Sequence, residues 1–211
     1  MKLRYSPTSP FVRKVMVVAY ETGLEPRIER IPTAVAPTKR NDDVARENPL
    51  VKIPSLTTDE GLVIYDSSVI CEYLDTLHNG TKLFPASGKA RWVALRQQAL
   101  GDGILDAAIL GRYESLRPKE FQWSEWTDAQ LRKVRGALSA LEMECEAQAL
   151  APVAAGDVPT IGQLTIGCVL GYLDFRYASE AWRERHKRLG AWYEDFAKRR
   201  AMQQTVPKDA G

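Results

Sequence analysis

The 211-residue chain carries 29 Lys and Arg against 27 Asp and Glu, a formal net charge of +2, and 45% of its residues are hydrophobic. This balance gives no electrostatic basis for binding nucleic acid or an anionic membrane. The length is sufficient for one large domain or two small ones, each with a buried core. No apolar run approaches the roughly 20 residues that span a bilayer, and the N-terminus lacks a signal-peptide pattern, so we expect a cytoplasmic protein.

The cysteines and histidines predict neither a disulfide framework nor a metal site. Cys71, Cys145 and Cys168 are odd in number, widely spaced and set in apolar helical segments. We therefore expect buried, reduced thiols, which fit a reducing cytoplasm. His78 and His186 are isolated in the sequence, so we expect both at the surface and no bound metal.

Residues 1–78 alternate between strand and helix signals. Asp59-Glu60-Gly61 marks a hairpin between the last two strands of this half. We predict a mixed four-stranded sheet with helices on its faces, in which the first two strands are parallel and the last two antiparallel. The predicted strands are 2–5, 27–31, 55–58 and 62–65, and the predicted helices are 11–20, 41–47 and 69–78.

Strand signals stop after residue 78. Residues 79–87 have the composition of a linker, in which we expect Leu83 and Phe84 to form an apolar plug between two domains. The predicted helices that follow are 89–116, 127–150 and 164–177, and residues 182–200 are expected to form one or two more. The third of them is nearly free of charge and follows a capping box at Thr160–Gln163, so we expect it at the centre of an all-helical domain. The predicted domains are 1–78 and 88–203, with a tail at 204–211.

Ser9 stands between the first predicted strand and the first predicted helix, in the sequence Ser-Pro-Thr-Ser-Pro. Pro10 at the first helical position predicts a helix that begins directly behind Ser9. The hydroxyl of Ser9 then lies beside unpaired backbone N–H groups, where negative charge is favoured. On this local pattern alone, a serine that only caps its helix is the simpler interpretation.

Two further loops carry polar or restricted residues next to strands. Pro54 directly precedes a predicted strand, where a proline is tolerated and where a cis bond, although rare, leaves the backbone of Ile53 free to pair with an extended peptide. Asp66-Ser67-Ser68 follows a strand and precedes a helix, so its N–H groups form an anion site. An ordinary trans proline and a plain helix cap are the alternatives when each loop is taken alone.

Taken together, these stretches resemble the glutathione transferase superfamily. The resemblance rests on S-P-T-S-P-F-V-R-K-V at 6–15, N-P-L-V-K-I-P-S-L at 48–56 and I-Y-D-S-S-V-I-C-E-Y-L at 64–74, and it extends over essentially the whole chain. It is closest to bacterial members with a serine before the first helix. It implies a thioredoxin-like N-terminal domain, an all-α C-terminal domain, a cis bond before Pro54, glutathione as co-substrate and a homodimer.

The resemblance also implies which residues bind glutathione. Ser9 matches the serine that hydrogen-bonds the sulfur, and Tyr5 and Ser6 are its weaker rivals. Ile53 matches the residue whose backbone pairs with the cysteinyl unit, next to Pro54. Asp66 and Ser67 match the pair that holds the γ-glutamyl amino and carboxylate groups. The remaining positions implied are Lys52, Lys39 and Arg40 near the glycyl end, and Asp102, which in many members reaches glutathione in the partner subunit.

An electrophile pocket is expected between the domains, against the long helix at 89–116. Residues at i, i+4, i+7 and i+8 of that helix share one face. Core packing is the alternative for the two aliphatic members of this face, whereas the Arg and the Tyr are better candidates for a substrate wall. The expected pocket residues are Pro10, Phe11, Leu105, Ile109, Arg112 and Tyr113.

These expectations favour an enzyme that adds glutathione to small, mostly apolar electrophiles. The thioredoxin-like Cys-x-x-Cys is replaced by Ser9-Pro10-Phe11-Val12, so dithiol exchange through this turn is excluded. Two alternatives stay open. One is another glutathione-dependent reaction, such as peroxide reduction, ether cleavage or dehalogenation, and the other is a non-catalytic glutathione-binding or ligand-binding regulatory protein.

Overall fold

The computed structural model describes residues 1–154 and 156–209. The N-terminal half contains β1 (Lys2–Tyr5), α1 (Pro10–Glu21), η1 (Glu25–Arg27), β2 (Glu29–Pro32), α2 (Asp42–Glu47), β3 (Leu56–Thr57), β4 (Val63–Ile64) and α3 (Ser67–Thr76). The C-terminal half contains α4 (Gly88–Ser115), η2 (Lys119–Phe121), α5 (Ser124–Glu146), α6 (Ile161–Arg176), η3 (Ala178–Glu180), α7 (Trp182–Arg185), α8 (Lys187–Phe196) and α9 (Arg200–Gln204).

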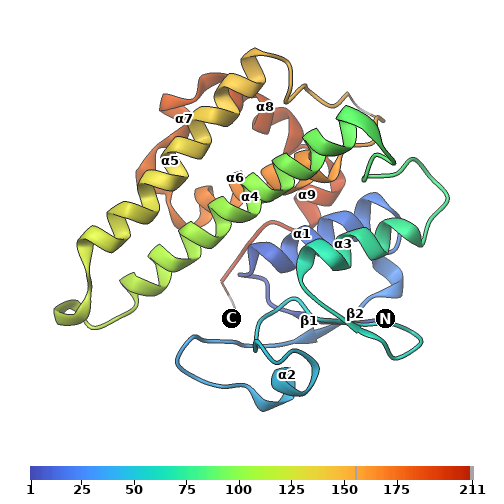
Figure 1. Ribbon diagram of the computed structural model, residues 1–211, viewed down its shortest axis with the longest axis horizontal. Coiled ribbons are helices and arrows are strands. Elements are labelled where there is room, and N and C mark those ends of the chain that lie inside the picture. Colours follow the sequence, from blue (N-terminus) through green and yellow to red (C-terminus); the bar gives the residue numbers. More distant parts are fainter. Residues whose placement is uncertain (155, 210–211) are drawn as a thin grey trace.

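The N-terminal half is thioredoxin-like and contains a mixed four-stranded sheet in the order β2-β1-β3-β4. β1 pairs parallel with β2, whereas β3 pairs antiparallel with both β1 and β4. Helices α1 and α3 lie on one face of this sheet, and α2 lies on the other side (Figure 1). The predicted sheet topology is therefore confirmed, although β3 and β4 are only two residues long each and shorter than predicted.

The C-terminal half is all-helical, as predicted. The long helices α4 and α5 run side by side in opposite directions, and α6 lies behind them (Figure 1). Ile161 to Leu173 of α6 are almost entirely buried, so the charge-free helix forms the centre of this half. Its capping box is complete, because Thr160 accepts from the N–H of Gln163 at 3.3 Å and the Gln163 side chain accepts from the N–H of Thr160 at 2.8 Å.

Several helix boundaries differ from the prediction. α3 begins at Ser67, two residues earlier than expected, and α6 begins at Ile161 rather than 164. Residues 182–200, expected to form one or two helices, contain α7 and α8, with α9 starting at Arg200. α5 begins at Ser124 rather than 127. The N–H of its N-cap residue Trp123 donates to the carboxylate of Glu114, nine residues earlier, at 2.8 Å. A carboxylate from the preceding helix is not part of the usual N-cap sequence pattern, so the start of α5 carries little local signal.

The segment between the two halves is anchored by a carboxylate. Leu83 and Phe84 are buried, which confirms the apolar plug. Their backbone N–H groups donate to Asp75, at 2.9 and 3.1 Å respectively. The domain bounds 1–78, 79–87, 88–203 and 204–211 stay a prediction, and residues 210 and 211 of the predicted tail lie outside the described residues.

The cysteines are buried as expected, whereas His186 is not at the surface, where we expected it. All three cysteines are free and buried, as expected. The expectation of a surface position was wrong for His186, which is only 7% exposed. Its Nδ1 lies 2.9 Å from the Trp182 carbonyl oxygen and its Nε2 lies 3.3 Å from the Ser139 hydroxyl. These two partners allow an isolated imidazole to be buried without a metal. Across residues 1–154 and 156–209, no helix is both long and apolar enough to cross a membrane.

Candidate functional site

The sheet register brings three loops together at one edge. Leu3 of β1 faces Leu56 of β3, which in turn faces Ile64 of β4. Continuing these antiparallel registers by two residues brings Tyr5, Pro54 and Asp66 into one row. The turn that leads to Ser9, the loop before β3 and the loop before α3 therefore leave the sheet at the same end.

Ser9 is the N-cap of α1. Its Oγ accepts from the N–H of Val12 at 3.3 Å, and its carbonyl oxygen accepts from the N–H of Arg13 at 3.0 Å. The side chain is half-buried. Because Oγ acts here as an acceptor, its own proton remains available for donation to an anion beside the helix N-terminus.

The rivals of Ser9 make other contacts. The Ser6 and Thr8 hydroxyls lie 3.0 Å apart and share a hydrogen bond. The ring of Tyr5 faces the guanidinium of Arg30, whose central carbon lies 5.7 Å from the ring centre. Ser9 caps α1, whereas neither Tyr5 nor Ser6 lies at a helix N-terminus.

The loop before β3 is organised by Asn48, which the sequence analysis had not singled out as a functional residue. The buried Asn48 side chain donates to the Lys52 carbonyl at 3.0 Å and accepts from the N–H of Leu50 at 3.0 Å. Val51 adopts φ 54°, a region that a β-branched residue rarely occupies. The Ile53-Pro54 bond is cis, as the resemblance implied.

Asp66 and Ser67 form the start of α3. Asp66 is the N-cap, and its carboxylate accepts from the N–H of Ser68 at 2.9 Å. Asp66 is exposed, whereas Ser67 in the first turn is buried. This end of α3 therefore presents an exposed carboxylate suited to an ammonium group beside N–H groups suited to a carboxylate.

The structure places Asp102 in a contact that the sequence did not predict. Its two carboxylate oxygens accept from Nζ of Lys14 in α1, at 2.6 and 2.8 Å. One of them also accepts from the hydroxyl of Ser68 in α3, at 3.2 Å. Asp102 thus joins α4 to both helices that cover the sheet, while its implied role toward glutathione in a partner subunit stays a prediction.

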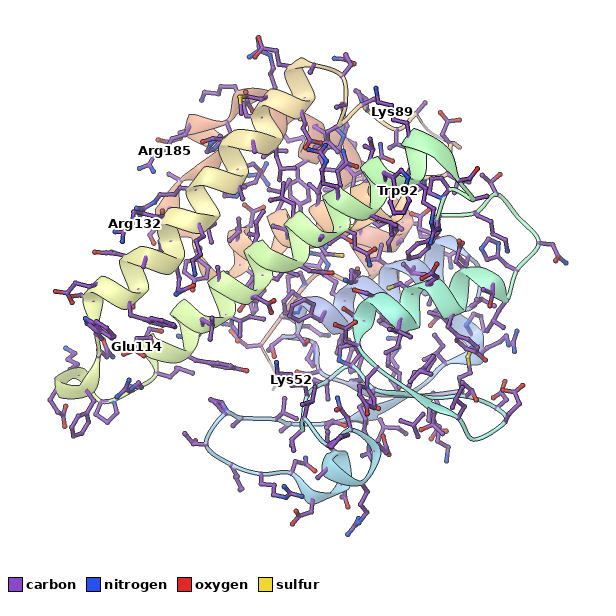
Figure 2. The ribbon with its side chains drawn as sticks, in the orientation of Figure 1. Lys52, Lys89, Trp92, Glu114, Arg132 and Arg185 are labelled. Carbon is purple, nitrogen blue, oxygen red and sulfur yellow. The ribbon has the colours of Figure 1, made fainter. Side chains whose placement is uncertain are left out.

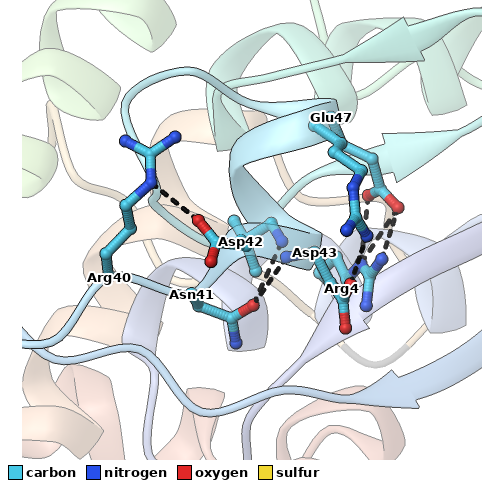
Figure 3. Close-up of polar contacts among 8 residues, drawn as sticks. Arg4, Arg40, Asn41, Asp42, Asp43 and Glu47 are labelled. Atoms are coloured by element: carbon cyan, nitrogen blue, oxygen red, sulfur yellow. Dashed lines mark hydrogen bonds and ion pairs between the residues drawn. The ribbon is translucent and has the colours of Figure 1, made fainter.

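The basic residues expected near the glycyl end are all exposed. Lys39 and Arg40 lie in the loop before α2, where Nε of Arg40 donates to Asp42 at 2.8 Å (Figure 3). Lys52 projects from the loop before β3 on the side of α4 (Figure 2). Desolvation raises the pKa of the Asp106 carboxyl on α4, and the charge of Lys52 opposes that rise.

The expected pocket residues do not share one environment. Leu105 has no exposed surface, which fits the core-packing alternative. Pro10 is also buried, and Phe11, Ile109 and Arg112 are half-buried. Tyr113 is 37% exposed, and desolvation raises the pKa of its hydroxyl. The polar end of this α4 face is the part that a bound molecule can reach.

A small hollow of about 10 Å³ beside Ser9 includes residues that sequence reasoning missed. Ser6, Ser9 and Arg13 line it together with Gln204 and Thr205. Nε of Arg13 donates to the Thr205 hydroxyl at 3.4 Å, and another guanidinium nitrogen donates to the Met202 carbonyl at 3.3 Å. Arg13 follows Ser9 by one helical turn, which is a usable signal, whereas nothing in the sequence places residues 204 and 205 here.

Comparisons with known proteins agree with this arrangement. The sequence pattern of the glutathione S-transferase N-terminal domain matches residues 8–77, and that of the glutathione S-transferase C-terminal domain matches residues 124–195. The chain is 31% identical over 210 residues to an uncharacterised GST-like protein of Escherichia coli K12, YibF, and the alignment covers 100% of both chains.

Solved structures give the same result. A glutathione transferase family member of Pseudomonas fluorescens Pf-5, solved with bound glutathione, is 44% identical, has a TM-score of 0.92 and matches over 99% of each chain. A structure from the same organism with bound S-(propanoic acid)-glutathione is 44% identical, has a TM-score of 0.87 and matches over 99% of this chain and 100% of that one. The chain described here therefore belongs to the glutathione S-transferase superfamily.

Proposed function

We propose that the protein is a glutathione transferase that activates the thiol of glutathione for attack on small, mostly apolar electrophiles. The observation that carries the proposal is the position of Ser9, whose hydroxyl caps α1 with its proton free to donate. This hydroxyl lies at the sheet edge where the loops of Pro54 and Asp66 also end. The glutathione and the glutathione conjugate bound by the Pseudomonas fluorescens proteins support the same substrate for this chain.

Each part of the tripeptide has a matching group in the proposal. The backbone of Ile53 pairs with the cysteinyl unit, and the cis Pro54 follows it. The exposed Asp66 carboxylate binds the γ-glutamyl amino group, while the N–H groups and hydroxyl of Ser67 bind the γ-glutamyl carboxylate. Lys52 is the first basic candidate for the glycyl carboxylate, and Lys39 and Arg40, which lie in another exposed loop, are the alternatives.

Activation follows from the chemistry of thiols. The thiolate is the nucleophile, and a free thiol has a pKa near 8.5, so most glutathione is unreactive at neutral pH. A hydroxyl donor and a helix N-terminus both stabilise the thiolate, which lowers that pKa. Ser9 supplies the donor and α1 supplies the helix end, while the reacting sulfur comes from glutathione.

The electrophile is proposed to lie between Ser9 and the polar end of the α4 face. Ile109, Arg112 and Tyr113 form the wall of this site, and Phe11 closes it from α1. The fully buried Leu105 and the buried Pro10 support the wall from behind rather than touching substrate. A homodimer in the cytoplasm is part of the same proposal, with Asp102 near the partner's glutathione.

Replacement of Ser9 tests the assignment. A hydrogen bond to a charged group contributes roughly 1.5–3 kcal/mol, so we expect Ser9→Ala to lower the rate of conjugation about 10- to 100-fold. Ser6→Ala is the matched control, because Ser6 lies in the same turn and the hydrogen bonds of its hydroxyl are with Thr8. We expect Ser6→Ala to stay within about twofold of the native rate. Equal rates for the native protein and Ser9→Ala would remove Ser9 from the mechanism.

Simple assays distinguish the alternative functions. Retention on a glutathione column and thiolate absorbance on adding glutathione are expected of every catalytic alternative. A panel of aryl halides, peroxides, aryl ethers and haloalkanes then distinguishes conjugation from peroxide reduction, ether cleavage and dehalogenation. Glutathione binding without thiolate absorbance would favour the non-catalytic regulatory protein instead.

A further inference from the structure

Lys14 is a fully buried cation in the first half of α1. Its side chain has 0% of its surface exposed, whereas that of its partner Asp102 is 21% exposed. Nζ of Lys14 donates to both carboxylate oxygens of Asp102, at 2.6 and 2.8 Å. With no exposed surface, Lys14 cannot touch a substrate, so its role in any reaction must be exerted through Asp102.

The contact continues from Asp102 into the first turn of α3. The Ser68 hydroxyl donates to the Asp102 oxygen that Lys14 also contacts, at 3.2 Å. The N–H of Ser68 donates to the Asp66 carboxylate at 2.9 Å. A continuous set of hydrogen bonds thus runs from α1 through α4 to Asp66, which is proposed to hold the γ-glutamyl amino group next to Ser67.

Burying the Lys14 ammonium costs free energy of folding unless the ammonium stays paired with Asp102. An ammonium group without water is stable in the fold only when it is paired and hydrogen-bonded. The side chain of Phe11 lies near Lys14, with its ring centre 5.8 Å from Nζ, but an aromatic face is a weaker partner than a carboxylate. Asp102 is therefore held close to Lys14, and the position of Asp102 in turn restricts where Ser68 can lie.

We propose that Lys14 is a positioning residue, which acts through Asp102 and Ser68 to hold the γ-glutamyl site on α3 in register with the sulfur site on α1. This inference rests on the proposed function, because it assigns the first turn of α3 to glutathione. It gives Asp102 a role within its own chain. It also separates two properties of the site: Ser9 sets the thiolate pKa, and the Lys14–Asp102–Ser68 set determines the affinity for the tripeptide.

Calorimetric titration with glutathione tests the proposal. Ser68→Ala removes only the bond between the Ser68 hydroxyl and Asp102 and keeps the backbone N–H that donates to Asp66. Lys14→Met removes the charge at nearly the same side-chain length. We expect both variants to raise the Kd for glutathione about 3- to 10-fold, less than the loss of a direct bond to a charged ligand. At saturating glutathione, the thiolate pKa should equal that of the native protein.

The matched control is Glu21→Gln, which weakens another ion pair between α1 and the C-terminal half, Glu21–Arg199. A merely structural role for Lys14 predicts that all three variants raise the Kd equally or not at all. The proposal predicts a raised Kd for Ser68→Ala and Lys14→Met and an unchanged Kd for Glu21→Gln. If Lys14→Met does not fold, Ser68→Ala against Glu21→Gln decides alone.

Two negative results have different meanings. If the native protein does not bind glutathione, the proposed function fails and this inference fails with it. If the native protein binds glutathione and Ser68→Ala binds it equally well, the proposed function stands and the positioning role is overturned. A raised Kd accompanied by a raised thiolate pKa would also overturn it, since the affinity and activation of the thiol would then not be separate.

Discussion

Two ion pairs join α1 to the C-terminal half, one in the first half of the helix and one at its last residue, and the two pairs differ. In the first half of the helix, Lys14 has no exposed side-chain surface and its partner Asp102 continues to Ser68. At the last residue of α1, Glu21 accepts two bonds from Arg199, at 2.9 and 2.8 Å, with side-chain exposures of 11% and 17%. Arg199 also donates to the Asp157 carbonyl at 3.0 Å and lies over the Phe196 ring, and neither residue belongs to the candidate site.

This difference shows that the same kind of contact can have unequal consequences. Both pairs hold the domains together, and about 10 Å of helix separates them. Only the Lys14 pair reaches a residue of the candidate site, so only that pair can influence how glutathione is held. The Glu21 pair therefore serves as a control, because it stabilises the fold without contacting the candidate site.

The largest predicted effect is on stability and concerns Asp102. Asp102→Ala leaves a fully buried ammonium without its partner, which costs about 3–5 kcal/mol in the free energy of unfolding. Glu21→Gln leaves a partly exposed guanidinium that still bonds to a carbonyl, and we expect about 1–2 kcal/mol. Urea unfolding of both variants measures the two values. A larger loss for Glu21→Gln would contradict the ranking of the two pairs.

Gly171 tests a third connection, between α1 and α6. A Cβ at Gly171 would lie 2.1 Å from a guanidinium nitrogen of Arg13 and 2.6 Å from the Tyr193 hydroxyl oxygen. We expect Gly171→Ala to cost about 1–3 kcal/mol through this overlap. Displacement of Arg13 would also loosen Thr205 beside Ser9. Thermal unfolding measures the loss, and Gly136→Ala is the matched control, since nothing lies within 4 Å of its Cβ position.

The smallest predicted effect lies wholly within the helical half. Arg135 donates to Glu180 at 2.8 and 2.9 Å, and this hydrogen bonding lowers the pKa of the Glu180 carboxyl. Because the folded pKa lies below the unfolded value, the stabilisation is present above the unfolded pKa and disappears as the pH falls through the folded one.

At neutral pH we therefore expect Glu180→Gln to cost less than about 1 kcal/mol, since Arg135 is largely exposed. Near pH 3, unfolding curves of the native and variant proteins should approach each other. A difference that grows on acidification would mean that Glu180 stabilises the fold by another route.

The helix caps and the sheet could be predicted from local signals. A serine before Pro10 and an aspartate after β4 act on neighbouring backbone, and the sheet topology follows from short connections and a glycine-containing hairpin. Taken alone, these signals favoured plain caps and a trans proline. The resemblance to the family implied the cis bond and one shared site, and the register explains why the loops meet.

The remaining features depend on partners far apart in the chain. Lys14 stands in the apolar stretch Phe-Val-Arg-Lys-Val-Met-Val-Val, which predicts burial, but its partner lies 88 residues away. The burial of His186 likewise depends on Ser139, which lies 47 residues away. No local pattern reports such tertiary contacts, so these features were missed or wrongly placed.

The thiolate absorbance of bound glutathione, followed as a function of pH, tests the central claim most directly. We expect the native protein to lower the thiol pKa below its free value near 8.5. Ser9→Ala should return the pKa toward that value, while Ser68→Ala should leave it lowered and weaken only the affinity. A thiol pKa that is the same in the native protein and in Ser9→Ala would contradict the role of Ser9 in activation.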